Sequence, residues 1–325
     1  MSLMPASVVF AIAAVCAGFM GFAIQRGATC TVAAMDEVVR KRSASRLASM
    51  VEASLWVLGG LLIAQALHVL RTMPVGYAVT ATTIVGGALL GLGAFVNGAC
   101  VFGAIARLGS GEWAYLATPL GFYVGCLTEG RVIPVPAQDA LPTGAPVLQA
   151  SAWLALVFIA AMAWRIGRAW IDARAGVRAA VASRVWSPHG ATIVIGVTFV
   201  ILLLLTGAWA YTDVLAELAR GMAGNLSARV LLAFALLLGA IIGGSTAGRL
   251  RGTRVTAMQI AKCLAGGVLM GWGSLLIPGG NDGLVLVGMP LLWPYAWVAF
   301  ATMCATIGAA QWAQQALAPS ALRSG

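Results

Sequence analysis

Charged residues are scarce in this sequence: only 9% of its 325 residues are Asp, Glu, Lys or Arg, and only 10 residues are acidic. A soluble protein of this length needs far more charge to cover its surface. Hydrophobic residues make up 61% of the chain, with a mean hydropathy of +0.93. Several apolar runs reach the roughly 20 residues that cross a bilayer as a helix. The composition therefore excludes an ordinary soluble domain and predicts an integral membrane protein.

Other absences narrow the class. The short alternating segments of outer-membrane barrels are missing, so we expect an all-α polytopic bundle, whose helices satisfy their own backbone hydrogen bonds in lipid. The six cysteines form no CxxC pair and no metal-ligand spacing. No phosphate-binding GxxxxGK[ST] motif is present. We therefore expect no metal, no cofactor and no ATP hydrolysis by this chain.

The net charge of +10 is concentrated in a few short loops, which indicates membrane orientation rather than nucleic-acid binding. We expect nine spans, near residues 5–24, 47–67, 77–96, 112–127, 150–164, 190–211, 229–247, 257–277 and 291–313. The basic loops carry Arg26, Arg40, Lys41, Arg42 and Arg46, then Arg165, Arg168, Arg174, Arg178 and Arg184, then Arg249, Arg251 and Arg254. These loops share one side if the N-terminus is outside and the C-terminus is cytoplasmic, as expected for a multi-pass protein of a bacterial inner membrane.

The sequence repeats itself at an offset of 180 residues. Residues 86–93 read GGALLGLG and residues 266–273 read GGVLMGWG. The matched spans are five crossings apart, and an odd number of crossings inverts the second copy. We therefore expect one integral membrane domain made of three parts. These are a first repeat at 1–130, an outside loop with a connector span and a basic cytoplasmic loop at 131–184, and a second, inverted repeat at 185–325. The alternative is that Gly-rich apolar helices resemble one another by composition alone.

Glycine and proline interrupt the apolar runs at matched positions. Residues 24–36 read IQRGATCTVAAMD and residues 97–111 read NGACVFGAIARLGSG; their repeat mates are 204–216 and 277–290. Such breaks at membrane depth are tolerated where the backbone lines a cavity or is buried in protein. The N-termini of the short re-entrant helices that follow would attract an anion. The predicted substrate site therefore lies where the breaks converge.

Thiols occupy two of the four matched break positions, Cys30 and Cys100, whereas the other two hold Ala210 and Gly280. A thiol is a soft, weak hydrogen-bond donor that also behaves as a small hydrophobe. It would contact the terminal sulfur of a sulfur-containing anion without holding it too tightly for passage. The alternative is that both thiols are merely small buried hydrophobes.

Polar residues beside the breaks complete the candidate substrate site, each with a structural alternative. Arg26, next to Gln25, either guides anions or extends to the membrane interface. Asn97 and Asn281 bond either the opened backbone or the substrate. Asp282 is either functional, as ionisable groups in membranes usually are, or a cap for the short helix that follows it.

The break sequences resemble those of the YeeE/YedE family of bacterial sulfur-transport membrane proteins, which includes thiosulfate importers. The resemblance rests on GFAIQRGATC at 21–30, NGACVFGAIARLGSG at 97–111 and GGVLMGWGSLLIPGGNDG at 266–283. It implies that Cys30 and Cys100 relay the substrate. The family usually carries a third cysteine where this chain has Gly280, and Asp282 replaces an apolar residue.

The resemblance and the breaks together predict a transporter or channel, not an enzyme, for a small sulfur-containing anion such as thiosulfate or a relative. Two alternatives remain open: a membrane thiol redox relay, and a transporter of another solute such as a selenium species. The expected partners are the anion and the lipid bilayer, without nucleic acid. The sequence leaves open whether a cytoplasmic sulfurtransferase-type protein receives the substrate.

Overall fold

The computed structural model describes residues 6–70, 73–128, 131–132, 138–173, 185–222 and 226–317. This part of the chain is helical, which confirms the expected all-α class, and its one β-bridge joins Tyr77 and Ala140. The helices of the first half are α1 (Ala6–Gly27), α2 (Thr31–Lys41), α3 (Ser45–Ala66), α4 (Ala81–Asn97), α5 (Val101–Gly109) and α6 (Ala117–Leu127). Those that follow are α7 (Ala152–Ala173), α9 (Pro188–Thr206), α10 (Tyr211–Ala219), α11 (Leu226–Thr246), α12 (Ala257–Leu276), α13 (Asn281–Gly283) and α14 (Pro294–Leu317). Short 3₁₀ turns form at Trp113–Leu116 and Pro146–Gln149, and a π-helical turn at Leu284–Gly288 follows α13.

Several helices are long and apolar enough to cross a membrane, so the chain is a multi-pass membrane protein. Five such stretches lie in the described residues: Ala6–Lys41, Ser45–Ala66, Ala81–Gly109, Pro188–Thr206 and Ser227–Thr246. A sixth is added if α12 and the segment Asn281–Gly288, bent by 50° at the break between them, form one span. The expected number of nine is therefore not confirmed.

The span expected at 112–127 is shorter than predicted, because its beginning forms the 3₁₀ turn and leaves α6 with 11 residues. At 1.5 Å per residue α6 is about 16 Å long, well below the thickness of the hydrocarbon core. The basic positions Arg174, Arg178 and Arg184 lie outside the described residues.

Helices α4 and α12 cross through two pairs of glycines. A Cβ atom on Gly93 would lie 2.7 Å from the carbonyl oxygen of Gly266, and one on Gly273 would lie 2.7 Å from that of Gly86. Only glycine allows backbones to approach this closely. At the offset of 180 residues, Gly93 corresponds to Gly273 and Gly86 corresponds to Gly266. Each contact is therefore the counterpart of the other, as expected for a pair of inverted repeats.

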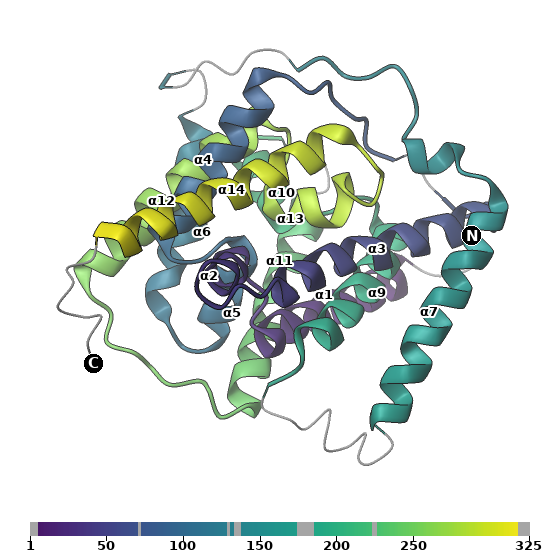
Figure 1. The fold of residues 1–325 in the computed structure, drawn as a ribbon, viewed down its shortest axis with the longest axis horizontal. Helices are drawn as coiled ribbons and strands as arrows, with labels where there is room; N and C mark the ends of the chain where they lie inside the picture. The colour runs from purple at the N-terminus through teal and green to yellow at the C-terminus, as the bar shows by residue number, and fades with distance from the viewer. Residues whose placement is uncertain are drawn as a thin grey trace.

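The helices pack in two groups around the breaks. Helix α1 packs against α9 and α11, while α12 packs against α4 and α6. Helices α2 and α5 lie between these groups, and α7 runs along one edge of the molecule, where it contacts α3 (Figure 1). Side chains of α7 such as Leu156 and Trp164 are 68% and 61% exposed, as expected for a face toward lipid. The interrupted helices thus occupy the protein interior, where opened backbone is tolerated.

Candidate functional site

Four helices begin at the four matched break positions. Cys30, Cys100, Ala210 and Gly280 are the residues that immediately precede α2, α5, α10 and α13. Cys100 has φ −74° and ψ −179°, and Gly280 has φ −80° and ψ −179°. Cys30 and Ala210 are likewise both extended. The backbone therefore has matching geometry at each pair of positions, although the side chains differ.

The two thiols of the first half lie together. The Sγ atoms of Cys100 and Cys30 are 3.9 Å apart, and the backbone N–H of Thr31 donates to the Sγ of Cys100 over an N···S distance of 3.1 Å. Cys100 is fully buried, whereas Cys30 is partly exposed. Because Thr31 is the first residue of α2, the thiol of Cys100 takes up one of the N–H groups that a helix N-terminus leaves unpaired.

The matching place in the second half holds a carboxylate. The backbone N–H of Thr212 donates to Oδ2 of Asp282 over 3.0 Å, and the hydroxyl of Thr212 contacts Oδ1. Asp282 is 3% exposed. The sequence left two roles open for Asp282, a functional group or a cap for the helix that follows it, and predicted no contact with α10, the neighbouring helix that this side chain caps. Gly280 leaves room for this arrangement, since a Cβ atom there would lie 2.2 Å from Oγ1 of Thr212.

Asn281 connects the two halves. Its side chain is fully buried, and Nδ2 lies 3.5 Å from Oγ1 of Thr31, the residue whose N–H is bound by Cys100. Its Oδ1 has no hydrogen-bond partner among the described residues. Asn281 is therefore the polar side chain that joins the thiol pair to the Asp282 carboxylate, which follows it in the chain.

Asn97 forms hydrogen bonds within the first break. Its Nδ2 donates to the carbonyl oxygen of Ala99 over 2.6 Å, and its Oδ1 accepts from the hydroxyl of Thr118 over 2.8 Å. Of the two predicted roles, the structure contains the bond to the opened backbone. Asn97 is thus placed to hold the chain that leads into Cys100.

Gln25 and Arg26 are buried, with exposures of 1% and 3%. The guanidinium of Arg26 donates from Nε to the carbonyl oxygen of Gly243 over 3.0 Å and from Nη2 to Oγ1 of Thr246 over 2.9 Å. Gln25 Nε2 donates to Oγ of Ser110 over 3.3 Å. Arg26 therefore joins α1 to α11 and does not extend to an exposed interface.

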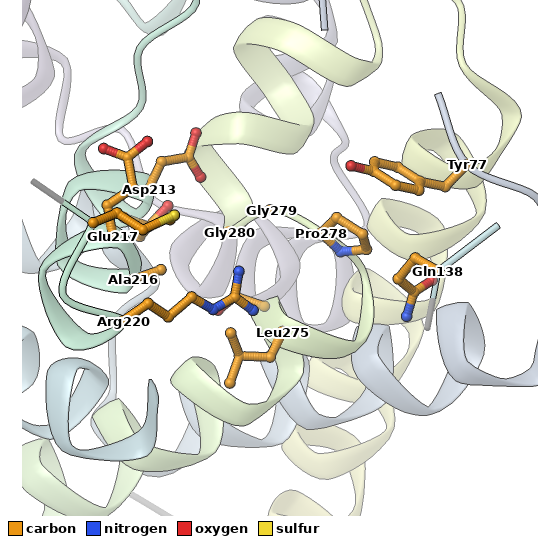
Figure 2. Close-up of a pocket in the computed structure, with 13 residues that line it drawn as sticks. Tyr77, Gln138, Asp213, Ala216, Glu217, Arg220, Leu275, Pro278, Gly279 and Gly280 are labelled. Atoms are coloured by element: carbon orange, nitrogen blue, oxygen red, sulfur yellow. The ribbon is translucent and has the colours of Figure 1, made fainter. Parts of the chain in front are cut away.

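Two polar cavities lie among the described residues, and the first of them reaches the break position Gly280. The first, here called the Asp213 cavity, has a volume of about 520 Å³. In Figure 2, one side of it is lined by Asp213 and Glu217 of α10 and by Arg220, which follows that helix. Tyr77 and Gln138 lie on the opposite side, and Pro278, Gly279 and Gly280 lie between. The second, of about 570 Å³, is lined by residues that include Ser110, Glu112, Arg249 and Arg251. Neither of these two cavities is lined by Cys30 or Cys100.

Sequence reasoning missed Thr212 and Asp213. Both lie in the stretch 204–216, which the repeat had already placed opposite Cys30. The signal available was a hydroxyl and a carboxylate directly after the break position Ala210. Neither residue type is specific to a break, because Thr and Asp are also common at ordinary helix starts.

Comparison with known proteins agrees with the resemblance seen in the break sequences. A search among curated protein sequences finds no match. The model of a protein family described as "Sulphur transport" matches residues 26–309, a region that contains all four breaks and both thiols. The chain therefore belongs to the sulphur transport family of membrane proteins.

Proposed function

We propose that this protein carries a small sulfur-containing anion, thiosulfate or a relative, across the bacterial inner membrane along the thiols of Cys30 and Cys100, without changing it chemically. The observation that carries the proposal is the 3.9 Å separation of the two Sγ atoms at the starts of α2 and α5. Helix N-termini supply unpaired N–H groups and a partial positive charge. Soft thiols beside them would bind a sulfur-bearing anion weakly enough for release.

In this proposal the two halves are inverted repeats, with residues 1–130 and 185–325 flanking a connecting part at 131–184. Its support is the equal backbone geometry at Cys100 and Gly280 and the paired glycine contacts of α4 and α12. We place the N-terminus outside and the C-terminus in the cytoplasm, because the basic loops then share the cytoplasmic side. The Asp213 cavity would then lead from outside to the second break.

The site residues divide by role in this proposal. Cys30, Cys100 and Asn281 contact the anion, since they lie at the junction of the halves. Arg26 and Asn97 are positioning residues whose hydrogen bonds hold α1 and the first break. Gln25 accompanies Arg26, and its Oε1 has no partner among the described residues.

Growth and uptake test the proposal. Expression in a strain that depends on thiosulfate and lacks its own importers should restore growth and the uptake of labelled thiosulfate. Cys100→Ser should reduce uptake strongly while leaving the protein folded, because a hydroxyl still accepts the Thr31 N–H but is not a soft donor. Cys304→Ala is the matched control, as it removes a buried thiol from the uninterrupted helix α14. Correct insertion without growth would exclude thiosulfate.

The redox relay remains the alternative, because the two thiols are close enough for a small movement to join them. An S–S bond is about 2.05 Å long, so the 3.9 Å separation would have to close by nearly half. A Cys30–Cys100 disulfide that turns over with an electron acceptor would favour the relay. Uptake of a selenium anion in place of thiosulfate would instead change the substrate but keep the pore.

A further inference from the structure

The two halves present different groups to the N-termini of their matched helices. In the first half the thiol of Cys100 accepts the N–H of Thr31, and in the second half the carboxylate of Asp282 accepts the N–H of Thr212. Helix α10 has 9 residues, and a helix N-terminus carries about half a positive charge. The carboxylate of Asp282 therefore already neutralises the partial positive charge at the N-terminus of α10, where a transported anion would otherwise bind.

The side chain of Asn281, beside this carboxylate, has a buried polar atom that a ligand could bind. Its side chain is 0% exposed, and one polar end approaches Thr31 while the other has no partner among the described residues. The buried Oδ1 of Asn281 therefore lacks a hydrogen bond, which is unfavourable unless a ligand supplies one.

We propose that Asp282 acts as a built-in anion that makes the pore select singly charged sulfur anions over doubly charged ones, with Asn281 contacting the transported anion between Cys100 and Asp282. The inference rests on the proposed function and specifies its substrate class. Coulomb repulsion grows with the product of the charges, so a dianion near Asp282 is repelled twice as strongly as a monoanion.

Other charged groups near Asp282 do not cancel this effect. Asp213 follows Thr212 on α10. A Cβ atom on Gly283, the neighbour of Asp282, would lie 3.8 Å from the Asp213 carboxylate, so a second acid lies close to this break. Glu217, one turn further along α10, forms an ion pair with Arg229 of α11. That pair is close to neutral as a unit. Arg220 lines the Asp213 cavity beside Asp213 and Glu217, whereas Asp282 does not line that cavity and is bound by Thr212. The proposed repulsion is therefore that of Asp282 at the break.

Flux through the purified full-length protein in lipid vesicles tests the inference, with thiocyanate as the singly charged probe and thiosulfate as the doubly charged one. The wild type should carry thiocyanate faster than thiosulfate. Asp282→Asn keeps an oxygen for the Thr212 N–H but removes the charge, so thiosulfate flux should rise about tenfold and thiocyanate flux only about threefold, since its repulsion is half as large. Asp36→Asn is the matched control, because it removes an exposed carboxylate paired with Arg40 and should change neither flux.

The outcomes separate the two proposals. If the wild type carries these anions but Asp282→Asn keeps the wild-type flux ratio, Asp282 is only a helix cap and this inference is overturned alone. If the wild type carries neither anion, the proposed function fails as well. Should Asp282→Asn not insert, Asn281→Asp provides the reverse test: its added charge should reduce thiosulfate flux about tenfold and thiocyanate flux only about threefold, and an equal loss of both would overturn the inference.

Discussion

Gly103 of α5 faces the thiol of Cys30. A Cβ atom added to Gly103 would lie 2.4 Å from the Sγ of Cys30 and 3.0 Å from its Cβ. The absent side chain at 103 therefore allows the two thiols at the starts of α2 and α5 to come within 3.9 Å of each other. Its repeat mate Gly283 faces Ala210 with room to spare, since a Cβ there would lie 3.8 Å from the Ala210 Cβ.

This difference gives a prediction with an internal control. Gly103→Ala should push the Cys30 thiol out of position and lower thiosulfate uptake severalfold, with a loss of about 1–3 kcal/mol in stability from overpacking. Gly283→Ala makes the same chemical change at the mate position and should leave uptake and melting temperature close to wild type. Equal effects of both substitutions would show that the Gly103 contact does not position the thiol.

Gly280 cannot simply be converted into a third pore thiol. A Cβ atom at 280 would collide with Thr212, at 2.2 Å from Oγ1 and 2.7 Å from Cβ. We expect Gly280→Cys to lower stability by about 1–3 kcal/mol and to reduce uptake, although the substitution adds a thiol at the family position. Thr212→Ala should relieve the collision only in part, because the Cβ atom at 212 remains. Melting curves of the detergent-solubilised single and double variants test this, and an increase in uptake by Gly280→Cys alone would contradict it.

The helical class and the positions of the breaks follow from the sequence because they depend on local chemistry. Long apolar runs have few structural options in lipid, and glycines with positive φ angles, such as Gly98 and Gly207, end the helices at the breaks. The offset of 180 residues likewise predicted that Cys100 and Gly280 would occupy matched positions, and their backbone angles agree. Span lengths were less predictable, because Trp113–Leu116 continues an apolar pattern but forms a 3₁₀ turn.

The partners of the polar side chains could not be predicted, since they depend on which helix ends meet in space. A cap on its own helix was one of two roles expected for Asp282, and neither predicted that its carboxylate binds the N–H of Thr212, 70 residues away. Arg26 binds the carbonyl oxygen of Gly243, 217 residues away. Neither separation is encoded in local spacing, and the repeat offset alone does not specify contacts between its two copies.

Arg26 should matter for stability rather than for substrate affinity. Its guanidinium binds the carbonyl oxygen of Gly243 and the hydroxyl of Thr246, so Arg26→Ala removes two hydrogen bonds to a charged group and the packing of a buried side chain. We expect a loss of about 2–4 kcal/mol, seen as a lower melting temperature, with the KM for thiosulfate unchanged in the folded fraction. Arg40→Ala, which removes a 61% exposed guanidinium, should have little effect. A raised KM at normal stability would show instead that Arg26 guides the anion.

Polar contacts attach α7 to the bundle at Glu52. Glu52 of α3 accepts from Nε of Arg165 on α7 over 2.9 Å and also contacts Nδ1 of His189 at the start of α9. One carboxylate thus joins three helices, so Glu52→Ala should cost about 1–3 kcal/mol and Arg165→Ala less, because His189 remains bound. Asp36→Ala breaks an exposed pair with Arg40 and should cost close to nothing.

A double-mutant cycle on Glu52 and Arg165 separates their interaction from other effects of each substitution. We expect a coupling of about 0.5–1 kcal/mol, because the Arg165 side chain is 38% exposed and partly screened. Uptake per folded molecule should not change, since no contact of this cluster reaches the thiol pair or Asp282. A coupling near zero would mean that α7 is held by its apolar contacts with α3 alone, and an altered uptake would mean that the position of α7 influences the breaks.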